Sequence, residues 1–352
     1  MWGYILKRIL LMLPTLFGII LVTFIVLQLV PGGPVERMLA QFRARERGGE
    51  AGAGQIAPAG REGLVDLREE QRQYLNKLYG FDKPVAVQFW GWITRLFTFD
   101  FGESYYRHET VVRLVLDKLP VSLSLGGWSF LLVYATCIPL GIRKARMNGT
   151  PFDAVTSVAI LLGYSIPGFA LGVFLIVLFG GGSFLSWFPL RGLTSDAFDQ
   201  LSLSGKVLDY LWHLVLPLTC YVIGSFSFLT LLTKNSFLEQ IASRYVQVAR
   251  AKGASESRVL WGHVFRNAMI PVVLGFPDSF LSVFFGSSLL IETIFSLDGL
   301  GLLSYESIVS RDYPVVMATL FFFSLLALVG KLLSDLSLIL MDPRISFKQS
   351  AV

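Results

Sequence analysis

Six long apolar segments constrain this chain more than any other feature of its sequence. Each is long enough to cross a hydrocarbon core, which takes about 20 residues of helix. The segments are 9–30, 121–140, 155–179, 211–232, 270–291 and 315–333, and the first four contain no Asp, Glu, Lys or Arg. Backbone groups in lipid must be satisfied within their own segment, so continuous helices are expected. The sequence therefore predicts an all-α polytopic membrane protein with six transmembrane helices.

The distribution of basic residues predicts the orientation of these spans. With a cytoplasmic N-terminus, the cytoplasmic segments carry thirteen Lys and Arg residues, and the two short loops on the other side carry only Arg191, Lys206 and Arg311. This bias places both termini in the cytoplasm, with residues 341–352 as a tail. The first span, within 1–30, is interpreted as an uncleaved anchor, because no small-x-small cleavage site precedes residue 31. The positive net charge then reflects topology and implies no nucleic-acid partner.

The longest connection, residues 31–118, is expected on the outer side of the membrane between the first and second spans. Residues 45–63 are rich in Gly, Ala and charge, which is typical of a flexible insertion. Helical patterns follow over residues 64–78 and over residues 85–96, the second starting directly after Pro84. Two helices are therefore expected to form either a packing lid over the bundle or a platform for an external partner.

Polar residues inside the spans are costly in lipid and therefore informative. Asp278 lies about two turns into the fifth span, directly after Pro277. Its carboxylate is expected either to face a water-filled path or to pair with a basic group on another helix. Ser279 and Ser165 are the other residues predicted to line a translocation path, Ser165 because it lies beside Pro167.

Two further expectations concern the shape and the ends of the spans. Pro139, Pro167 and Pro217 are expected to kink their helices, which suits helices that must rearrange. Lys331 and Asp335, near the inner end of the last span, are expected to pair with each other at i, i+4 spacing.

No catalytic or cofactor-binding motif is present in the sequence. A phosphate-binding loop of the form GxxxxGK[ST] is absent, because Gly205 and Lys206 are followed by Val207. The three histidines are scattered over different loops and spans, so no metal site is expected. Cys137 and Cys220 both lie in apolar segments and are interpreted as small buried residues. The chain is accordingly expected to be non-catalytic and to bind no cofactor of its own.

A polar stretch between the fourth and fifth spans, residues 245–271, reads YVQVARAKGASESRVLWGHVFRNAMIP. Residues 245–252 follow helical spacing, Gly253 suits the positive φ that ends a helix, and Ser255 with Glu256 suits the start of a second helix. By physical reasoning alone, this stretch is either a docking point for a partner protein or an interfacial helix on anionic lipid.

The stretch resembles the cytoplasmic loop of binding-protein-dependent ABC importer permeases, in the dipeptide, oligopeptide and nickel branch, which reads approximately YVxxARAKG and then RNAxxP. At the EAA triplet of the wider superfamily stand Gln247, Val248 and Ala249, so the Glu is missing, as is usual in the peptide branch. The resemblance covers nearly the whole chain, including PGGP at 31–34, FDFGES at 99–104, SIPGF at 165–169, FPLRG at 188–192 and MDPRI at 341–345. Within the family, the chain looks most like the permease of the importer for oligopeptides and microcin C.

The resemblance implies a type I ABC importer permease in the bacterial inner membrane. It implies a scoop-like periplasmic domain over 31–118, a permease core over 119–340 and a cytoplasmic coupling loop over 233–269. The implied partners are a second homologous permease, two ATPase subunits or one fused ATPase, and a periplasmic substrate-binding protein. The residues implied to couple to the ATPases are Tyr245, Val246, Ala249, Arg250, Ala251, Lys252, Gly253, Ala254 and Ser255.

The implied activity is ATP-driven import of peptides by alternating access, with ATP and Mg bound by the partner subunits. Import of dipeptides, nickel chelates or other small peptides by the same machinery remains an alternative. A secondary transporter is the more remote one, since only one carboxylate, Asp278, lies deep in a span.

Overall fold

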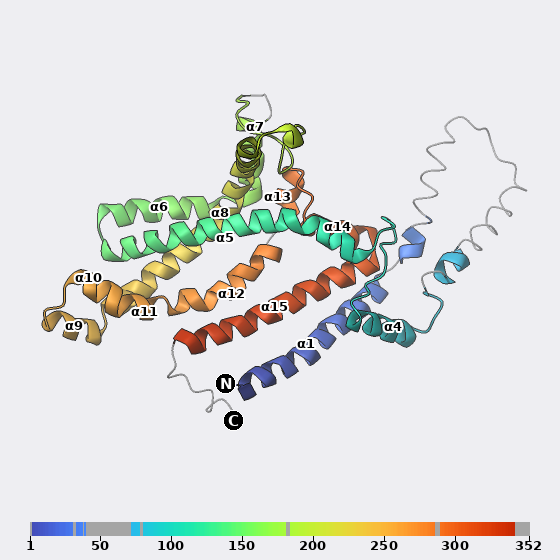
Figure 1. Ribbon diagram of the computed structural model, residues 1–352, viewed down its shortest axis with the longest axis horizontal. Helices are drawn as coiled ribbons and strands as arrows, with labels where there is room; N and C mark the ends of the chain where they lie inside the picture. The colour runs from blue at the N-terminus through green and yellow to red at the C-terminus, as the bar shows by residue number, and fades with distance from the viewer. Residues whose placement is uncertain are drawn as a thin grey trace, which may run out of the picture. The chain divides into compact units, whose positions relative to one another are not determined.

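The computed structural model describes residues 2–30, 33–37, 39, 72–77, 80–180, 184–285 and 289–341 (Figure 1). In this part of the chain every regular element is a helix, and extended backbone pairs only at an isolated bridge between Glu103 and Thr110. The all-α fold expected from the sequence is confirmed. The chain divides into two compact units: the first unit comprises Met1–Arg8, Lys118–Leu303 and Leu326–Val352, and the second comprises Ile9–Asp117 and Ser304–Leu325.

The first unit contains most of the apolar helices and the polar stretch that separates two of them. Its apolar helices are most of α5 (Val111–Arg146), α6 (Pro151–Ser165), α7 (Gly168–Phe179), α8 (Leu203–Ile241), α12 (Ile270–Phe285) and α13 (Leu289–Ile294). Between α8 and α12 lie α9 (Arg244–Ala251), α10 (Glu256–Val259), the π-helical turn η2 (Leu260–Val264) and α11 (Phe265–Ala268). A short 3-10 helix, η1 (Phe198–Gln200), precedes α8.

The second unit is built around α4 (Val85–Phe97), with most of α1 (Trp2–Leu29) and parts of α14 (Leu300–Ser310) and α15 (Tyr313–Met341). Pro84 caps the start of α4, whose buried face is Phe89, Ile93 and Leu96, so the helical pattern expected over residues 85–96 is confirmed. The ring of Phe89 lies 5.3 Å from that of Phe24 in α1. Residues 72–77 are helical, while the rest of the first pattern, the insertion at 45–63 and the tail beyond 341 lie outside the described residues.

Four helices, α1, α5, α8 and α15, are each long and apolar enough to cross a membrane. The described residues contain six such spans if each of two bent helix pairs counts as one span. α6 and α7 form the first pair, bent by 90°. At the bend Ile166 is extended (φ −92°, ψ 118°) and Pro167 caps α7, because a proline disfavours helical backbone at the preceding residue.

The kink expected at Pro167 is therefore confirmed, and the expectation that this span is one continuous helix is wrong. Pro139 and Pro217 lie inside α5 and α8, each of which runs as a single helix through its proline. In the second bent pair, the helical run Glu256–Ala268 meets α12 at an angle of 50°.

Helix α8 packs closely against α5 and α7 at two glycines. A Cβ on Gly141 of α5 would come within 2.6 Å of the Cβ of Thr233, and one on Gly168 of α7 would come within 2.7 Å of the carbonyl oxygen of Cys220. Small residues allow helices in lipid to approach closely, where van der Waals contact drives their association. Cys137 and Cys220 are both buried and free, as the sequence predicted.

Candidate functional site

The stretch between α8 and α12 is fastened to the ends of two long helices by a buried apolar cluster. Figure 1 shows α9, α10 and α11 together at one end of the first unit. Ile142 and Ala145 of α5 and Phe237 of α8 supply one side of the cluster. The stretch supplies the other side with Val246, Val259, Leu260, Val264 and Ala268. A force applied to this stretch is therefore transmitted to α5 and α8 through packed side chains.

The turn between α9 and α10 depends on Gly253, whose φ is +81°. The Gly253 N–H donates to the Arg250 carbonyl (2.9 Å) and the Ala254 N–H donates to the Ala249 carbonyl (3.1 Å), which together form a Schellman motif. Ala249 and Ala254 also pack against the same apolar cluster, the contact that usually accompanies this motif. The positive φ expected for Gly253 is confirmed, as is the start of the next helix after Ser255.

An ion pair closes this turn on its exposed side. Arg250 Nε lies 2.8 Å from Glu256 Oε1, and Arg250 Nη2 lies 3.0 Å from Glu256 Oε2. The pairing is bidentate, so it orients α9 relative to α10. The guanidinium holds the pKa of the exposed Glu256 carboxyl below its usual range, and solvent screening keeps its contribution to stability small.

The hydroxyl of Tyr245 connects three parts of the stretch. It donates to Gln240 Oε1 at the end of α8 (2.9 Å) and accepts from Asn267 Nδ2 in α11 (3.2 Å). Tyr245 begins the YVxxARAKG pattern and Asn267 belongs to the RNAxxP pattern, so the two halves of the motif meet at a hydrogen bond.

The predicted coupling residues divide into exposed and inward-facing groups. Val246 is fully buried, and Ala249 and Ala254 are half-buried in the apolar cluster, so these three position the loop rather than contact a partner. The exposed members are Tyr245, Arg250, Ala251, Lys252, Gly253 and Ser255.

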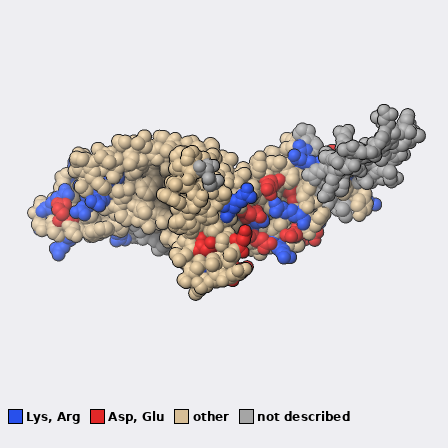
Figure 2. All heavy atoms as spheres, turned by 90° about the horizontal axis from the view of Figure 1, so that it is seen from above, with Lys and Arg blue, Asp and Glu red and all other residues tan. Residues whose placement is uncertain are grey.

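Two large apolar side chains on the same stretch are also exposed, Val248 by 52% and Trp261 by 56%. Figure 2 shows Lys, Arg and acidic side chains gathered at the end that carries α9 and α10, beside a broad uncharged face. Exposed apolar side chains on a stretch that also carries exposed charges are typical of a protein contact. Trp261 was not singled out from the sequence. Residues three apart share a face of a helix, so the charged Arg258 could have indicated that Trp261 is exposed too.

A buried ionic cluster next to this site was also missed. Lys144 of α5 is fully buried, with its Nζ 3.0 Å from Asp153 Oδ1 in α6. Lys144 donates as well to Thr156 Oγ1 (2.7 Å) and Ser157 Oγ (2.8 Å). Lys234 of α8 lies 2.7 Å from the other carboxylate oxygen, Asp153 Oδ2. Both lysines are among the thirteen basic residues from which the orientation was predicted, and in the structure they join α5, α6 and α8.

Of the residues predicted for a translocation path, only Ser279 is among the residues that line the grooves described below. Asp278 is exposed, and no ion pair reaches it from any residue that the structure describes. Ser279 lies on a groove between helices. Ser165 Oγ donates to the Leu161 carbonyl within α6 (2.9 Å).

The pair expected between Lys331 and Asp335 is not formed. Arg8 Nη2 lies 2.8 Å from Asp335 Oδ2. Asp335 is only 14% exposed, and a guanidinium from a neighbouring helix compensates such a carboxylate better than an i, i+4 lysine directed to the interface. The interpretation as a local surface pair is therefore wrong.

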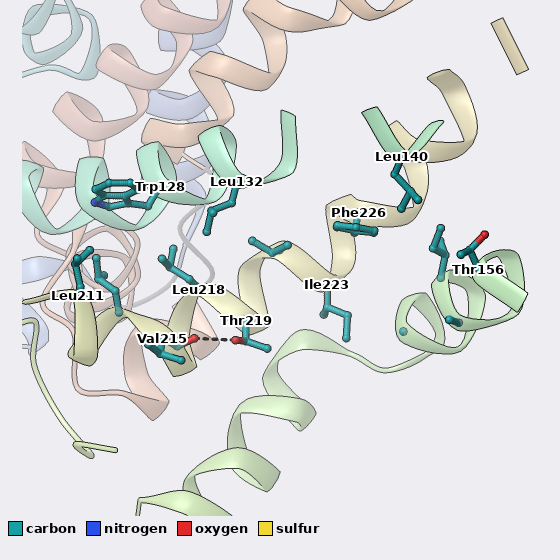
Figure 3. Close-up of a pocket in the computed structure, with 15 residues that line it drawn as sticks. Trp128, Leu132, Leu140, Thr156, Leu211, Val215, Leu218, Thr219, Ile223 and Phe226 are labelled. Carbon is teal, nitrogen blue, oxygen red and sulfur yellow. Dashed lines mark hydrogen bonds between the residues drawn. The ribbon is translucent and has the colours of Figure 1, made fainter. Parts of the chain in front are cut away.

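Two grooves open among the helices of the first unit. The larger, of about 740 Å³, is lined by α5, α6 and α8. Figure 3 shows Trp128 and Leu132 of α5 and Leu218 and Ile223 of α8 along it, and the hydroxyl of Thr219 is already bonded to the Val215 carbonyl (2.7 Å). This groove therefore presents an apolar surface. The smaller one, of about 480 Å³, contains Ser279 and several other hydroxyl groups.

Residues 137–347, which include the whole loop, match the family described as "Binding-protein-dependent transport system inner membrane component". The chain belongs to this family. The membrane character and permease architecture expected from the resemblance are thereby confirmed.

Three curated relatives match this permease along essentially its full length. The peptidoglycan transport system permease protein YejB of Agrobacterium fabrum is 50% identical and covers 100% of both chains. The inner membrane ABC transporter permease protein YejB of Escherichia coli O157:H7 is 47% identical, over 99% of this chain and 100% of its own. The oligopeptide transport system permease protein AppB of Bacillus subtilis is 32% identical, over 99% and 100%.

Proposed function

We propose that this chain is the transmembrane permease subunit of an ATP-driven, binding-protein-dependent importer that moves peptides from the periplasm to the cytoplasm. The observation that carries the proposal is the exposed turn around Gly253 on a loop fastened to α5 and α8, in a chain of this permease family. ATP is hydrolysed by partner ATPase subunits, either two chains or one fused chain, and not by this subunit. The remaining partners are a second homologous permease and a periplasmic substrate-binding protein.

The coupling surface consists of the exposed part of α9 and of the turn after it, from Tyr245 to Ser255, together with Val248 and Trp261. Closure of the ATPases moves α9, and the buried Val246 and its cluster carry that motion to the ends of α5 and α8. The 50° bend between α11 and α12 and the 90° bend at Pro167 are the points at which spans can change direction. Alternating access also requires that ATP, or the loaded binding protein, bind the two states with different affinity.

The topology that goes with this mechanism places both termini and the loop 233–269 in the cytoplasm. Residues 31–118 form the periplasmic receiving domain, and 119–340 form the permease core. The thirteen basic residues in the cytoplasmic segments support this orientation.

Oligopeptides are the proposed substrate class, with microcin C-like peptide-nucleotides included, and the oligopeptide relative AppB supports it. A second candidate is a peptide released from peptidoglycan, which is favoured by the name of the full-length relative at 50% identity. Both candidates are peptides, so the same path and coupling loop serve either.

Reconstitution in liposomes tests the proposal directly. The permease, its homologous partner and the ATPases are inserted together, and uptake of labelled oligopeptide, peptidoglycan-derived peptide and microcin C is measured with the binding protein and ATP. We expect uptake that requires both ATP and binding protein. Uptake driven by an ion gradient without ATPases would instead establish a secondary transporter.

A further inference from the structure

The smaller groove of the first unit has an unusual lining for a membrane protein. Its polar side chains are three tyrosines and three serines, contributed by α5, α6, α8 and α12. They are Ser129, Tyr134, Tyr164, Tyr221, Ser225 and Ser279. We call this the hydroxyl groove. Among the residues that the structure describes, no Asp, Glu, Lys or Arg lines it.

Several of these hydroxyl groups remain able to bind a ligand. Ser129 Oγ donates to the Gly126 carbonyl (2.9 Å), which leaves its own oxygen free to accept. Tyr164 is 60% exposed, and neither it nor Ser225 has a hydrogen-bond partner in the described part of the chain. The hydroxyl groups of Tyr134 and Ser279 bond to each other and thereby link α5 to α12 across the groove.

The walls of the hydroxyl groove are open and aromatic. A Cβ on Gly224 or Gly275 would meet no atom within 4 Å, so these glycines leave space beside the backbone. Phe130 packs edge to face on Phe276, with ring centroids 5.0 Å apart, and lies 4.5 Å from Tyr134. The result is a surface with hydrogen-bonding groups next to broad apolar faces.

Such a surface matches the chemistry of a peptide. The backbone of any peptide carries N–H donors and carbonyl acceptors, whatever its sequence. These groups need hydrogen-bond partners when the peptide leaves water. Hydroxyl groups both donate and accept, and aromatic rings accommodate apolar and, through their faces, cationic side chains. The larger groove of Figure 3 lacks this combination, because its lining is apolar and its Thr219 hydroxyl is already bonded.

We propose that the hydroxyl groove is this subunit's contribution to the peptide path, and that its lack of charge lets acidic and basic peptides pass with similar ease. The inference rests on the proposed function. A charged lining would attract peptides of one sign and repel those of the other, as rings of charged side chains do in selective channels. Asp278 does not alter this, because it is exposed beside the groove and does not line it.

The test is to give the groove a charge of either sign. Ser225→Asp and Ser225→Lys are assembled with the partner subunits, and uptake of two peptides of equal length, one acidic and one basic, is measured at saturating binding protein. We expect Ser225→Asp to raise the basic-to-acidic uptake ratio about tenfold and Ser225→Lys to lower it about tenfold, because charges a few ångströms apart in a partly desolvated site interact strongly. Uptake ratios equal to the wild-type ratio in both variants would overturn the proposal.

Ser204→Asp and Ser204→Lys are the matched controls, since Ser204 is exposed in the first turn of the same helix and does not line the groove. If the Ser204 variants change the basic-to-acidic uptake ratio as much as the Ser225 variants do, the effect is a general electrostatic one, and the proposal is overturned as well. Should the charged Ser225 variants fail to assemble, Ser225→Cys is labelled with small anionic or cationic thiol reagents during turnover. The same opposite shifts are expected, and their absence counts against the groove. Failure of the wild-type complex to move any peptide would contradict the proposed function instead.

Discussion

Lys234 Nζ lies 2.7 Å from Asp153 Oδ2, which joins α8 to the first turn of α6. The same carboxylate receives the fully buried ammonium of Lys144 from α5. Three helices therefore meet on one acidic side chain at the end of the bundle that carries α9, where the loop between α8 and α12 is also packed against α5 and α8 (Figure 1). A motion of the loop would therefore act on three helices that are joined to one another, and not on separate helix ends.

Replacement Asp153→Asn should destabilise the chain by about 3–5 kcal/mol, because Lys144 would stay buried without its counter-charge. Thermal unfolding of the purified protein in detergent measures the loss. Asp199→Asn is the control: Asp199 is fully exposed at 4.0 Å from Lys206, and its replacement should leave the unfolding temperature unchanged. Equal effects of the two replacements would show that the buried cluster is not a structural junction.

The replacement Gly253→Val should leave membrane insertion intact but uncouple ATP hydrolysis from peptide uptake, so that ATP is hydrolysed without transport. A Cβ at this position would meet nothing within 4 Å, so the effect comes from the φ of +81°, which costs an ordinary residue about 1–2 kcal/mol and a β-branched one more. Gly253→Asn is the matched variant, because Asn tolerates this conformation and should retain most of the uptake. Normal uptake by an assembled Gly253→Val complex would contradict the role proposed for this turn.

Val246 and Val248 lie two residues apart on α9 and should respond differently to substitution. Val246→Ala removes two fully buried methyl groups and should lower the stability of the permease alone by about 2 kcal/mol. Val248→Asp changes a side chain that is 52% exposed, so it should reduce the amount of ATPase that co-purifies while leaving the unfolding temperature of the isolated permease unchanged. Retention of ATPase binding by Val248→Asp together with Trp261→Asp would place the docking surface elsewhere.

Asp312, between α14 and α15 in the second unit, should make that unit sensitive to pH. Burial raises the pKa of its carboxyl above the ordinary 3.8, although the Ser104 hydroxyl and the Tyr105 N–H, 3.1 Å from Oδ1, bind it and oppose the shift. Because the folded pKa exceeds the unfolded one, this contribution to stability is complete below pH 3.8 and is lost as the pH rises through the folded pKa. Protection from hydrogen exchange of the Leu114 amide, which lies in the same unit and donates to the Thr110 carbonyl, should thus increase as the pH is lowered through this window.

Asp312→Asn, which cannot ionise, is the comparison for that experiment. Protection of its Leu114 amide should change less with pH than in the wild-type protein once intrinsic exchange rates are taken into account. Equal pH dependence in the two proteins would assign the effect to other carboxyl groups.

Local features of the chain were predictable because their causes are local. The spans follow from uninterrupted apolar runs. The break at Pro167 follows from the missing N–H of proline and from the extended backbone that proline favours at Ile166. The turn at Gly253 follows from a positive φ, which other residues adopt at a cost. The sequence predicted a kink at Pro167 but not its angle of 90°, because no pattern of apolar residues determines the direction of the chain after a break.

Partners across the bundle were not predictable in the same way. Arg8 and Asp335 are more than three hundred residues apart in the sequence, and the residues around each do not indicate that the two form an ion pair. Lys144, Asp153 and Lys234 look like ordinary charges of the loops until α5, α6 and α8 pack together.

By itself, then, the sequence determined the class of the protein, the positions of its apolar helices and the turn at Gly253, because hydrophobicity, glycine and proline act within a few residues. Only the tertiary structure decided which residues of that loop face outward, which charges are buried together and which groove presents hydroxyl groups. Those properties arise from helix packing, which brings side chains from distant parts of the chain into contact and sets their exposure to water.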